Sequence, residues 1–349
     1  MTQGPIDEHE ELPWTARVYA MLPMPPLRVG VGIGALLLTA LVVSEWALGR
    51  FDPEVLATLR YDPNRDLRIA IIHCLLFAYA PTAYVVLIHR TRRTWLELHG
   101  LLGVSASDTQ AAMRRVGHRN RWLGATFVVS GLLLWVFATY ASSPEDPFAI
   151  ANITPEVWWA RTLGPFFVAY LVLFSTLIVE SSWLLSSSSS RIPELDLLNP
   201  DQIAPFKSQA LTHSLVIFGM AACASPFGFE AYLLGLSIGI WIFTIVVAAV
   251  GLLLPLVGIR RLIRSTRSRE LEWCDAELRS ARDEMKGREE AGQAGRFGEL
   301  YAYRQRLGEV SEWPLDAPSF VRFWLYLLIP LGSWLGGALV ERFVDAVVQ

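Results

Sequence analysis

The stretch WLGATFVVSGLLLWVFATYA, residues 122–141, determines the fold class. It contains no charged residue, and its length is about the 20 mostly apolar residues that a helix needs to cross a bilayer. Backbone N–H and C=O groups cannot remain unpaired in lipid, so such a stretch has to be helical. The sequence therefore predicts a transmembrane helix at this position.

Six further stretches meet the same criterion, and we predict an all-α, polytopic integral membrane protein with seven transmembrane helices. Hydrophobic residues make up 53% of the 349 residues and charged residues 18%, whereas soluble chains carry about 25% charge. This composition excludes a soluble enzyme, a nucleic-acid-binding domain and a disordered protein. It predicts that the partner of the chain is the lipid bilayer. The other predicted spans are 29–49, 69–89, 162–185, 208–226, 231–258 and 319–340.

The distribution of basic residues predicts the orientation of the chain. With the amino terminus inside, 24 of the 30 basic residues fall on the inner side, as expected for cytoplasmic segments. The span 208–226 has the weakest hydropathy, but without it the 12 basic residues of 259–317 would lie outside. We therefore predict a plasma-membrane protein with its amino terminus in and its carboxy terminus out. Arg outnumbers Lys 28 to 2, which favours a bacterial inner membrane.

The segment 259–317 is predicted to form a cytoplasmic helical hairpin. Leu271, Leu278 and Met285 recur every seven residues along its first half, and the glycine-bearing run 291–295 is expected to break that helix. Its 12 basic and 12 acidic residues are typical of a solvated face. The domains are then an N-terminal cytoplasmic segment (1–28), a six-helix transmembrane region (29–258), the hairpin (259–317), and the seventh helix with an outer C-terminus (318–349).

A second helix of this hairpin is expected over 296–310. Either the two helices bury their apolar faces against each other at the membrane base, or their apolar seam pairs with a neighbouring subunit or a cytoplasmic protein partner. The residues expected on the packed side of the second helix are Phe297, Leu300, Tyr301, Leu307 and Val310.

Motifs of soluble enzymes are missing or stand in the wrong context. The run 30–35 reads GVGIGA and matches a dinucleotide fingerprint, but it opens a transmembrane helix instead of following a strand. Its small residues, Gly30 and Gly34, are better explained as a close-packing face. No nucleophile elbow, P-loop or zinc spacing occurs among the Ser, His and Cys residues. We expect no cofactor, no metal and no catalytic residue, and a lipid-acting intramembrane enzyme is the least favoured hypothesis.

Two ionisable residues inside predicted spans form a candidate proton-sensitive pair. Glu180 lies near the inner end of its span, and His213 lies near the inner end of the next one. Consecutive spans usually lie side by side, so the carboxylate and the imidazole can meet and act as a latch. The alternatives are a satisfied polar pair or two side chains that reach the headgroups independently.

Small residues mark candidate helix-packing faces in the last two spans. Gly235 and Gly239 form a G-x-x-x-G pair in the sixth span. The seventh span holds two overlapping small-residue pairs and a proline that bends the helix. These features fit either tight packing within one subunit or a helix that lines a pathway, and the residues concerned are Gly332, Ser333, Gly336, Gly337 and Pro330.

Two acidic residues follow the seventh span on its outer side. In a symmetric homo-oligomer with this helix at the centre, Glu341 and Asp345 would form the outer mouth and attract cations. In a monomer they are a solvated helix end.

The topology resembles that of the seven-helix, ligand-gated channels of the insect chemoreceptor type. Those channels also have an inside amino terminus, an outside carboxy terminus and long cytoplasmic helices before the last span. Their last span carries a Thr-Tyr signature, whereas residues 323–327 read FWLYL here. Likeness of topology does not assign function, so the family is not assigned.

The sequence therefore favours an oligomeric channel-like or permeation protein with the seventh helix near the pathway. The alternative is a membrane sensor or scaffold that recruits a cytoplasmic partner through 259–317. An oligomeric ring would favour the first hypothesis, and a hairpin that binds a soluble protein would favour the second.

Overall fold

Every regular element that the structure describes is a helix, which confirms the all-helical class. The computed structural model describes residues 12–49, 52, 63–116, 125, 126, 128–133, 136, 155–193, 195–225, 234–287, 291–315, 317–329 and 332. The α-helices are α1 (Trp14–Ala20), α2 (Pro26–Ala47), α4 (Pro63–Leu102), α5 (Ala106–Arg115), α7 (Pro155–Ser188), α8 (Ala204–Ala224), α9 (Leu234–Gly287) and α10 (Ala291–Glu309). Two 3₁₀ turns, η2 (Ser189–Arg191) and η3 (Pro200–Ile203), connect α7 to α8.

Four of the described helices are long and apolar enough to cross a membrane, and their length and composition indicate membrane insertion. They belong to α2, α4, α7 and α9, where four of the predicted spans lie. A shorter apolar helix follows near the end of the chain. The helical segments that contain the four candidate spans are Pro26–Ala47, Leu67–Leu102, Arg161–Arg191 and Trp241–Asp283, and the shorter helix is Ala317–Ile329.

Several helices extend beyond the predicted spans because no helix-ending signal lies at the membrane edge. Helix α4 continues past residue 89 until Gly103, whose φ of 58° is the left-handed conformation common after a helix end. Helix α7 begins at Pro155, which suits the first turn of a helix because proline has no N–H to pair.

Helix α8 corresponds to the weakest predicted span, and it lies inside the bundle. It packs against α4 and α9, and most of its residues are buried. Three of its polar side chains therefore face protein instead of lipid, which explains why a central helix can be less apolar than its neighbours. The buried polar residues on α8 are Gln209, His213 and Ser214.

Close helix packing in the bundle depends on glycine. Gly30 and Gly34 of α2 are buried, and a Cβ on Gly30 would overlap the side chain of Thr82 on α4. Gly258 of α9 lies so close to the end of α7 that a Cβ would overlap the backbone carbonyl oxygen of Ser186. These positions need glycine because a side chain would separate the helices.

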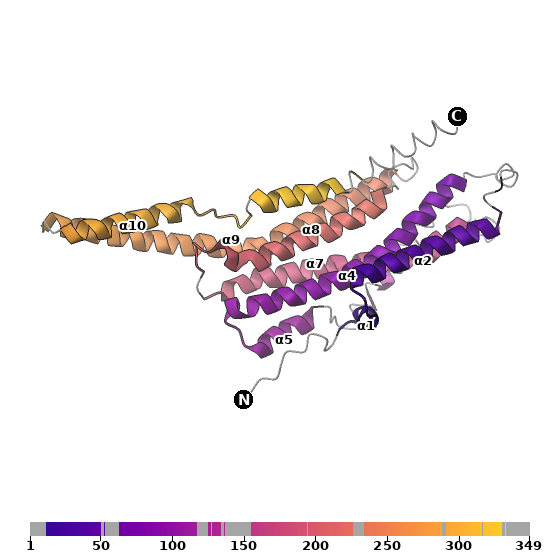
Figure 1. Ribbon diagram of the computed structural model, residues 1–349, viewed down its shortest axis with the longest axis horizontal. Helices are drawn as coiled ribbons and strands as arrows, with labels where there is room; N and C mark the ends of the chain where they lie inside the picture. Colours follow the sequence, from indigo (N-terminus) through magenta and orange to yellow (C-terminus); the bar gives the residue numbers. More distant parts are fainter. Residues whose placement is uncertain are drawn as a thin grey trace.

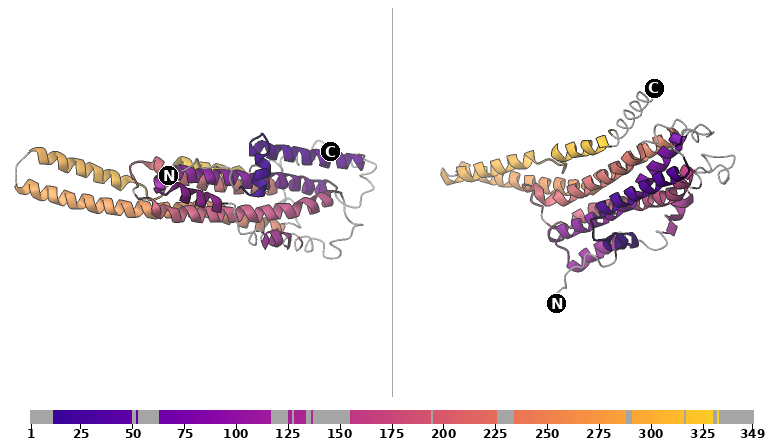
Figure 2. Two further views of the ribbon diagram at one scale, coloured as in Figure 1. Left: turned by 90° about the horizontal axis from the view of Figure 1, so that it is seen from below. Right: turned by 45° about the vertical axis from the view of Figure 1, so that its right-hand side comes forward.

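Helix α9 continues beyond the bundle, and α10 returns beside it as a projecting arm (Figures 1 and 2). We call residues 264–309 of this pair the arm. Helix α10 begins at Ala291, so the run 291–295 does not end the hairpin's helix as the sequence predicted but belongs to the second helix. A glycine within a helix costs only about 1 kcal/mol, which contacts with α9 can offset.

The apolar helix 317–329 leads from the arm back along the bundle (Figure 1). It rests on α8 through Phe323, whose ring lies 5.7 Å from the ring of Phe218. Its opposite face is exposed and bulky, with Phe320 54% and Leu328 54% exposed.

Candidate functional site

One face of α10 packs on α9 to form the arm. Leu307 is fully buried, and Leu300 and Tyr303 are half-buried. The ring of Tyr303 meets that of Trp273 edge to face at 6.5 Å. Tyr301, which the sequence placed on this face, is 57% exposed. The contacts follow the 300, 303, 307 spacing, and residue 301 lies about 100° away from residue 300 on the helix.

Ion pairs fix the register of the two helices. Arg304 donates to Asp275 at 2.5 Å, and Arg296 donates to Glu277 at 2.8 Å. The hydrogen bond from Arg304 holds the pKa of Asp275 below its usual value, so this pair remains ionised at neutral pH. The contribution of Asp275 to stability is therefore present above its ordinary pKa and is lost only as the pH falls through the lowered one.

The base of the arm is fastened by Arg267. Its guanidinium donates to the carbonyl oxygens of Leu307 at 2.9 Å and Gly308 at 2.7 Å. These are carbonyls of the last turn of α10, which a cation stabilises. Below them, the guanidinium of Arg260 lies 4.3 Å from the ring centroid of Trp313.

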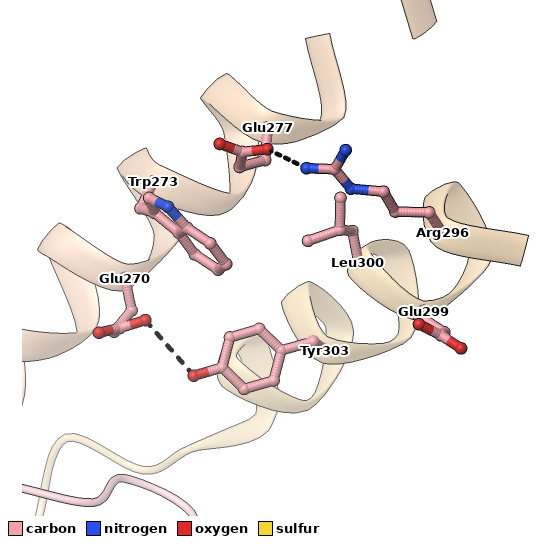
Figure 3. Close-up of a pocket in the computed structure, with 7 residues that line it drawn as sticks. All are labelled: Glu270, Trp273, Glu277, Arg296, Glu299, Leu300 and Tyr303. Atoms are coloured by element: carbon pink, nitrogen blue, oxygen red, sulfur yellow. Dashed lines mark hydrogen bonds and ion pairs between the residues drawn. The ribbon is translucent and has the colours of Figure 1, made fainter. Parts of the chain in front are cut away.

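A cavity of about 730 Å³ opens between α9 and α10 in the arm. Figure 3 shows the indole of Trp273 between Glu270 and Glu277 and facing α10. Trp273 is 50% exposed, and Glu270 accepts a hydrogen bond of 3.4 Å from the hydroxyl of Tyr303. We call this cavity the arm pocket, and it is lined by Glu270, Trp273, Glu277, Arg296, Glu299, Leu300 and Tyr303.

The arm pocket combines negative charge with aromatic surface. Its lining has three carboxylates and one guanidinium, and that guanidinium, on Arg296, already pairs with Glu277. The excess negative charge beside an exposed indole suits a cationic group, which an aromatic face and a carboxylate both attract.

Cys274 follows Trp273 in α9 and reports whether the arm is closed. Its side chain is fully buried, and burial, with the nearby carboxylates of Glu270 and Asp275, raises the pKa of the thiol. Because the thiolate is the reactive form, we expect iodoacetamide to modify Cys274 at least about tenfold more slowly than a cysteine at the exposed position in Tyr301→Cys. Peptide mass spectrometry measures both rates in one sample, and equal rates would mean that the two helices of the arm separate freely.

A second polar site lies inside the bundle around His213. The imidazole is fully buried, and its Nε2 lies 2.8 Å from the amide nitrogen of Gln209. That amide nitrogen also donates to Thr91 at 2.7 Å, and the amide oxygen accepts from Thr94 at 3.0 Å. Helices α4 and α8 are thereby joined through one glutamine.

The other side of the imidazole faces α7 and α9. Its Nδ1 lies 3.0 Å from the hydroxyl of Ser182 and 3.2 Å from the carbonyl oxygen of Gly251. That carbonyl has no helical partner, because Pro255 stands four residues on and has no N–H. Glycine is needed at 251, since a Cβ there would lie 2.9 Å from the Cβ of His213.

This hydrogen bonding determines the form of the imidazole. The carbonyl of Gly251 can only accept, so we assign the proton to Nδ1, and Nε2 then accepts from the Gln209 amide. One donor and one acceptor fit the neutral ring. We call Thr91, Thr94, Ser182, Gln209, His213 and Gly251 the histidine network, and it joins α4, α7, α8 and α9.

The histidine network has the geometry of a structural joint. Ser182 and His213 are both fully buried, so no substrate reaches the hydroxyl in this conformation. Within the described residues, no three His, Cys, Asp or Glu side chains gather as a metal site would require. What the network does is pair buried polar groups from four helices.

The structure describes only some of the residues proposed from sequence. Glu180 is half-buried and directly precedes Ser181, whose hydroxyl lies 3.2 Å from Nε2 of His213. The pairing of Glu180 with His213 stays a prediction. A Cβ placed on Gly239 or on Gly332 would have no neighbouring atom within 4 Å, so neither glycine contacts another part of the described chain there.

The remaining candidates lie largely outside the described residues. Gly235 is in α9, but its surroundings are not described. The proposed pathway and outer-mouth residues that lie outside the described residues are Pro330, Ser333, Gly336, Gly337, Glu341 and Asp345.

Sequence reasoning missed Gln209, Trp273 and Tyr303. A signal existed for the first: Gln209 and His213 stand four residues apart, so they share one face of a helix. The pairing of Trp273 with Tyr303 depends on how two helices are aligned, which no pattern within either helix determines.

Comparison with known proteins identifies no relative. No protein-family model, curated protein sequence or solved structure matches this chain.

Proposed function

We propose that this chain is a seven-span, plasma-membrane scaffold or sensor whose arm binds a soluble partner in the cytoplasm. The observation that carries the proposal is the arm pocket, a cavity with aromatic and acidic walls on a helical pair that projects from the bundle. A pair of helices that only closed the membrane base would have no need of such a cavity.

Seven spans with an inside amino terminus are part of this proposal. Support comes from the described helices, since α7, α8 and α9 run in alternating directions through the bundle (Figure 1). The described residues of the third predicted span are helical, and Gly131 among them lies against the backbone of Ala169 on α7. The basic residues of 259–317 favour the cytoplasm, and the bacterial inner membrane is the proposed location.

The chemistry of the arm pocket indicates a basic segment as the ligand. Two of its carboxylates, on Glu270 and Glu299, are not bonded to Arg296, whose described ion pair is with Glu277. A lysine or arginine side chain can lie over the half-exposed indole of Trp273 and pair with Glu270. An acidic or neutral segment would lack this attraction.

A peptide-binding experiment tests the proposal. The purified full chain is placed in phosphatidylcholine nanodiscs and titrated with fluorescent ten-residue peptides that are arginine-rich, glutamate-rich or uncharged. We expect the arginine-rich peptide to bind and its affinity to fall roughly tenfold in Trp273→Ala and in Glu270→Gln/Glu299→Gln, because one cation–π contact or charge pair is worth about 1 to 2 kcal/mol.

Glu272→Gln is the matched control, because Glu272 is exposed on α9 and does not line the pocket. It should bind the peptide like the unchanged chain. Equal affinities for all the variants would show that the peptide binds the arm through nonspecific charge attraction, and this result would contradict the proposal.

A channel built from several copies is the second candidate. The exposed face of helix 317–329 favours it, because Phe320, Trp324 and Leu328 are each at least 50% exposed at the edge of one chain. A pathway along this helix would need further copies around it. Current through a planar bilayer under a potassium chloride gradient tests this function. The absence of current at every voltage and pH tested would count against it.

A further inference from the structure

A second cavity lies at the inner end of the bundle, between α4, α5 and α7. Its volume is about 400 Å³, within the range of small-molecule sites. Its polar lining includes Asp108 of α5, Ser187 of α7 and Arg191 of η2. Two tryptophans, Trp95 and Trp183, lie on its walls. The cavity is separate from the arm pocket, so binding here is independent of the proposed function.

The two charged residues of this cavity have opposite sign and come from different elements. The carboxylate of Asp108 is held in place at the start of α5, where it accepts a hydrogen bond of 2.8 Å from the hydroxyl of Ser105. Arg191 is exposed and has no ion pair with any residue that the structure describes. A ligand that carries both a cation and an anion can therefore contact both residues at once.

The position of the cavity indicates a lipid. Trp183 is 62% exposed on α7, just before the serine run 186–190 where the apolar helix ends. Exposed tryptophan is typical of the membrane–water interface. Val179, one turn earlier on the same face, is 44% exposed, so an acyl chain can lie along this face while its headgroup enters the cavity.

Trp95 forms a buried part of the cavity wall. It is only 4% exposed, and its indole N–H is buried without a hydrogen-bond acceptor among the described residues.

We infer that this cavity binds a phosphoethanolamine group, the headgroup of phosphatidylethanolamine. Arg191 pairs with the phosphate, and Asp108 accepts hydrogen bonds from the primary ammonium. Phosphatidylcholine has no N–H to give to that carboxylate. Phosphatidylglycerol has no cation, so its phosphate would bring only negative charge to Asp108.

Native mass spectrometry of the full chain with added lipid tests the inference. We expect phosphatidylethanolamine to bind roughly tenfold more tightly than phosphatidylcholine or phosphatidylglycerol, as one charge-assisted hydrogen-bond pair would give. Arg191→Gln should weaken its binding roughly tenfold, and Arg191→Lys should restore most of it. Asp108→Asn should remove the preference over phosphatidylcholine.

The matched controls are Arg90→Gln and Asp201→Asn, which change exposed residues outside the cavity. Both should retain the preference, and retained helical circular dichroism shows that each variant is folded. Equal binding of the three lipids, or equal binding by Arg191→Gln and Arg90→Gln, would overturn the inference. If soluble phosphoethanolamine bound while phosphatidylethanolamine did not, a free phosphate ester would be the ligand and the lipid would be excluded.

Discussion

His213→Ala is expected to lower the free energy of unfolding by about 3 to 5 kcal/mol. The substitution removes a fully buried ring and leaves a cavity. It also leaves the amide of Gln209 and the carbonyl of Gly251 without their partner on His213. Circular dichroism of the purified full chain in detergent should show an apparent melting midpoint lower by roughly 10 °C.

Thr212→Ala is the control for this experiment. Thr212 is the next residue on α8, and its hydroxyl bonds only to the carbonyl of Ser208 within the same helix among the contacts described. Its loss should change the stability by less than about 0.5 kcal/mol. His213→Gln keeps one donor and one acceptor, so it should fall between the two. If His213→Ala melted like Thr212→Ala, the histidine network would not be what joins the four helices.

Gly258→Ala is expected to cost about 3 kcal/mol, although alanine is the better helix former. The added methyl group would overlap the backbone carbonyl of Ser186 and the hydroxyl of Ser189. A backbone atom cannot move aside as the end of a side chain can, so α9 would have to shift away from α7. The same melting experiment measures the effect.

Gly239→Ala makes the identical change where α9 has open space around it. Its stability should stay the same or rise by up to about 1 kcal/mol, the difference in helix propensity. Equal losses at the two glycines would show that the contact between α9 and α7 is not tight. A loss at Gly239 alone would point to a partner helix that packs on this face.

Hydropathy predicted the helical class and the location of the four longest apolar helices, because a backbone segment in lipid has to pair its own N–H and C=O groups. It was less informative for α8, whose sequence is diluted by polar residues. The structure explains the difference: α8 faces α4 and α9, so the requirement for apolar side chains applies to its neighbours instead. Only side chains that face lipid need to be apolar, and a helix inside the bundle exposes few side chains to lipid.

The candidate sites were harder to predict because their residues come together only through packing. His213 was singled out because it is ionisable, but the other members of its network, among them Thr91, Ser182 and Gly251, lie on three other helices. Pro255 frees the carbonyl of Gly251, and the sequence alone does not say which side chain uses it. The arm pocket likewise depends on the alignment of Trp273 with Tyr303.

The proposed function requires the arm to lie in the cytoplasm, and cysteine labelling tests this location. A membrane-impermeant maleimide is added to intact cells that carry Tyr301→Cys or Asp52→Cys, and labelled peptides are identified by mass spectrometry. Residue 301 is exposed on the arm, and residue 52 follows the predicted outer end of the first span. We predict that position 52 is labelled in intact cells and position 301 only after permeabilisation. Labelling of position 301 in intact cells would place the arm outside and contradict the proposed function.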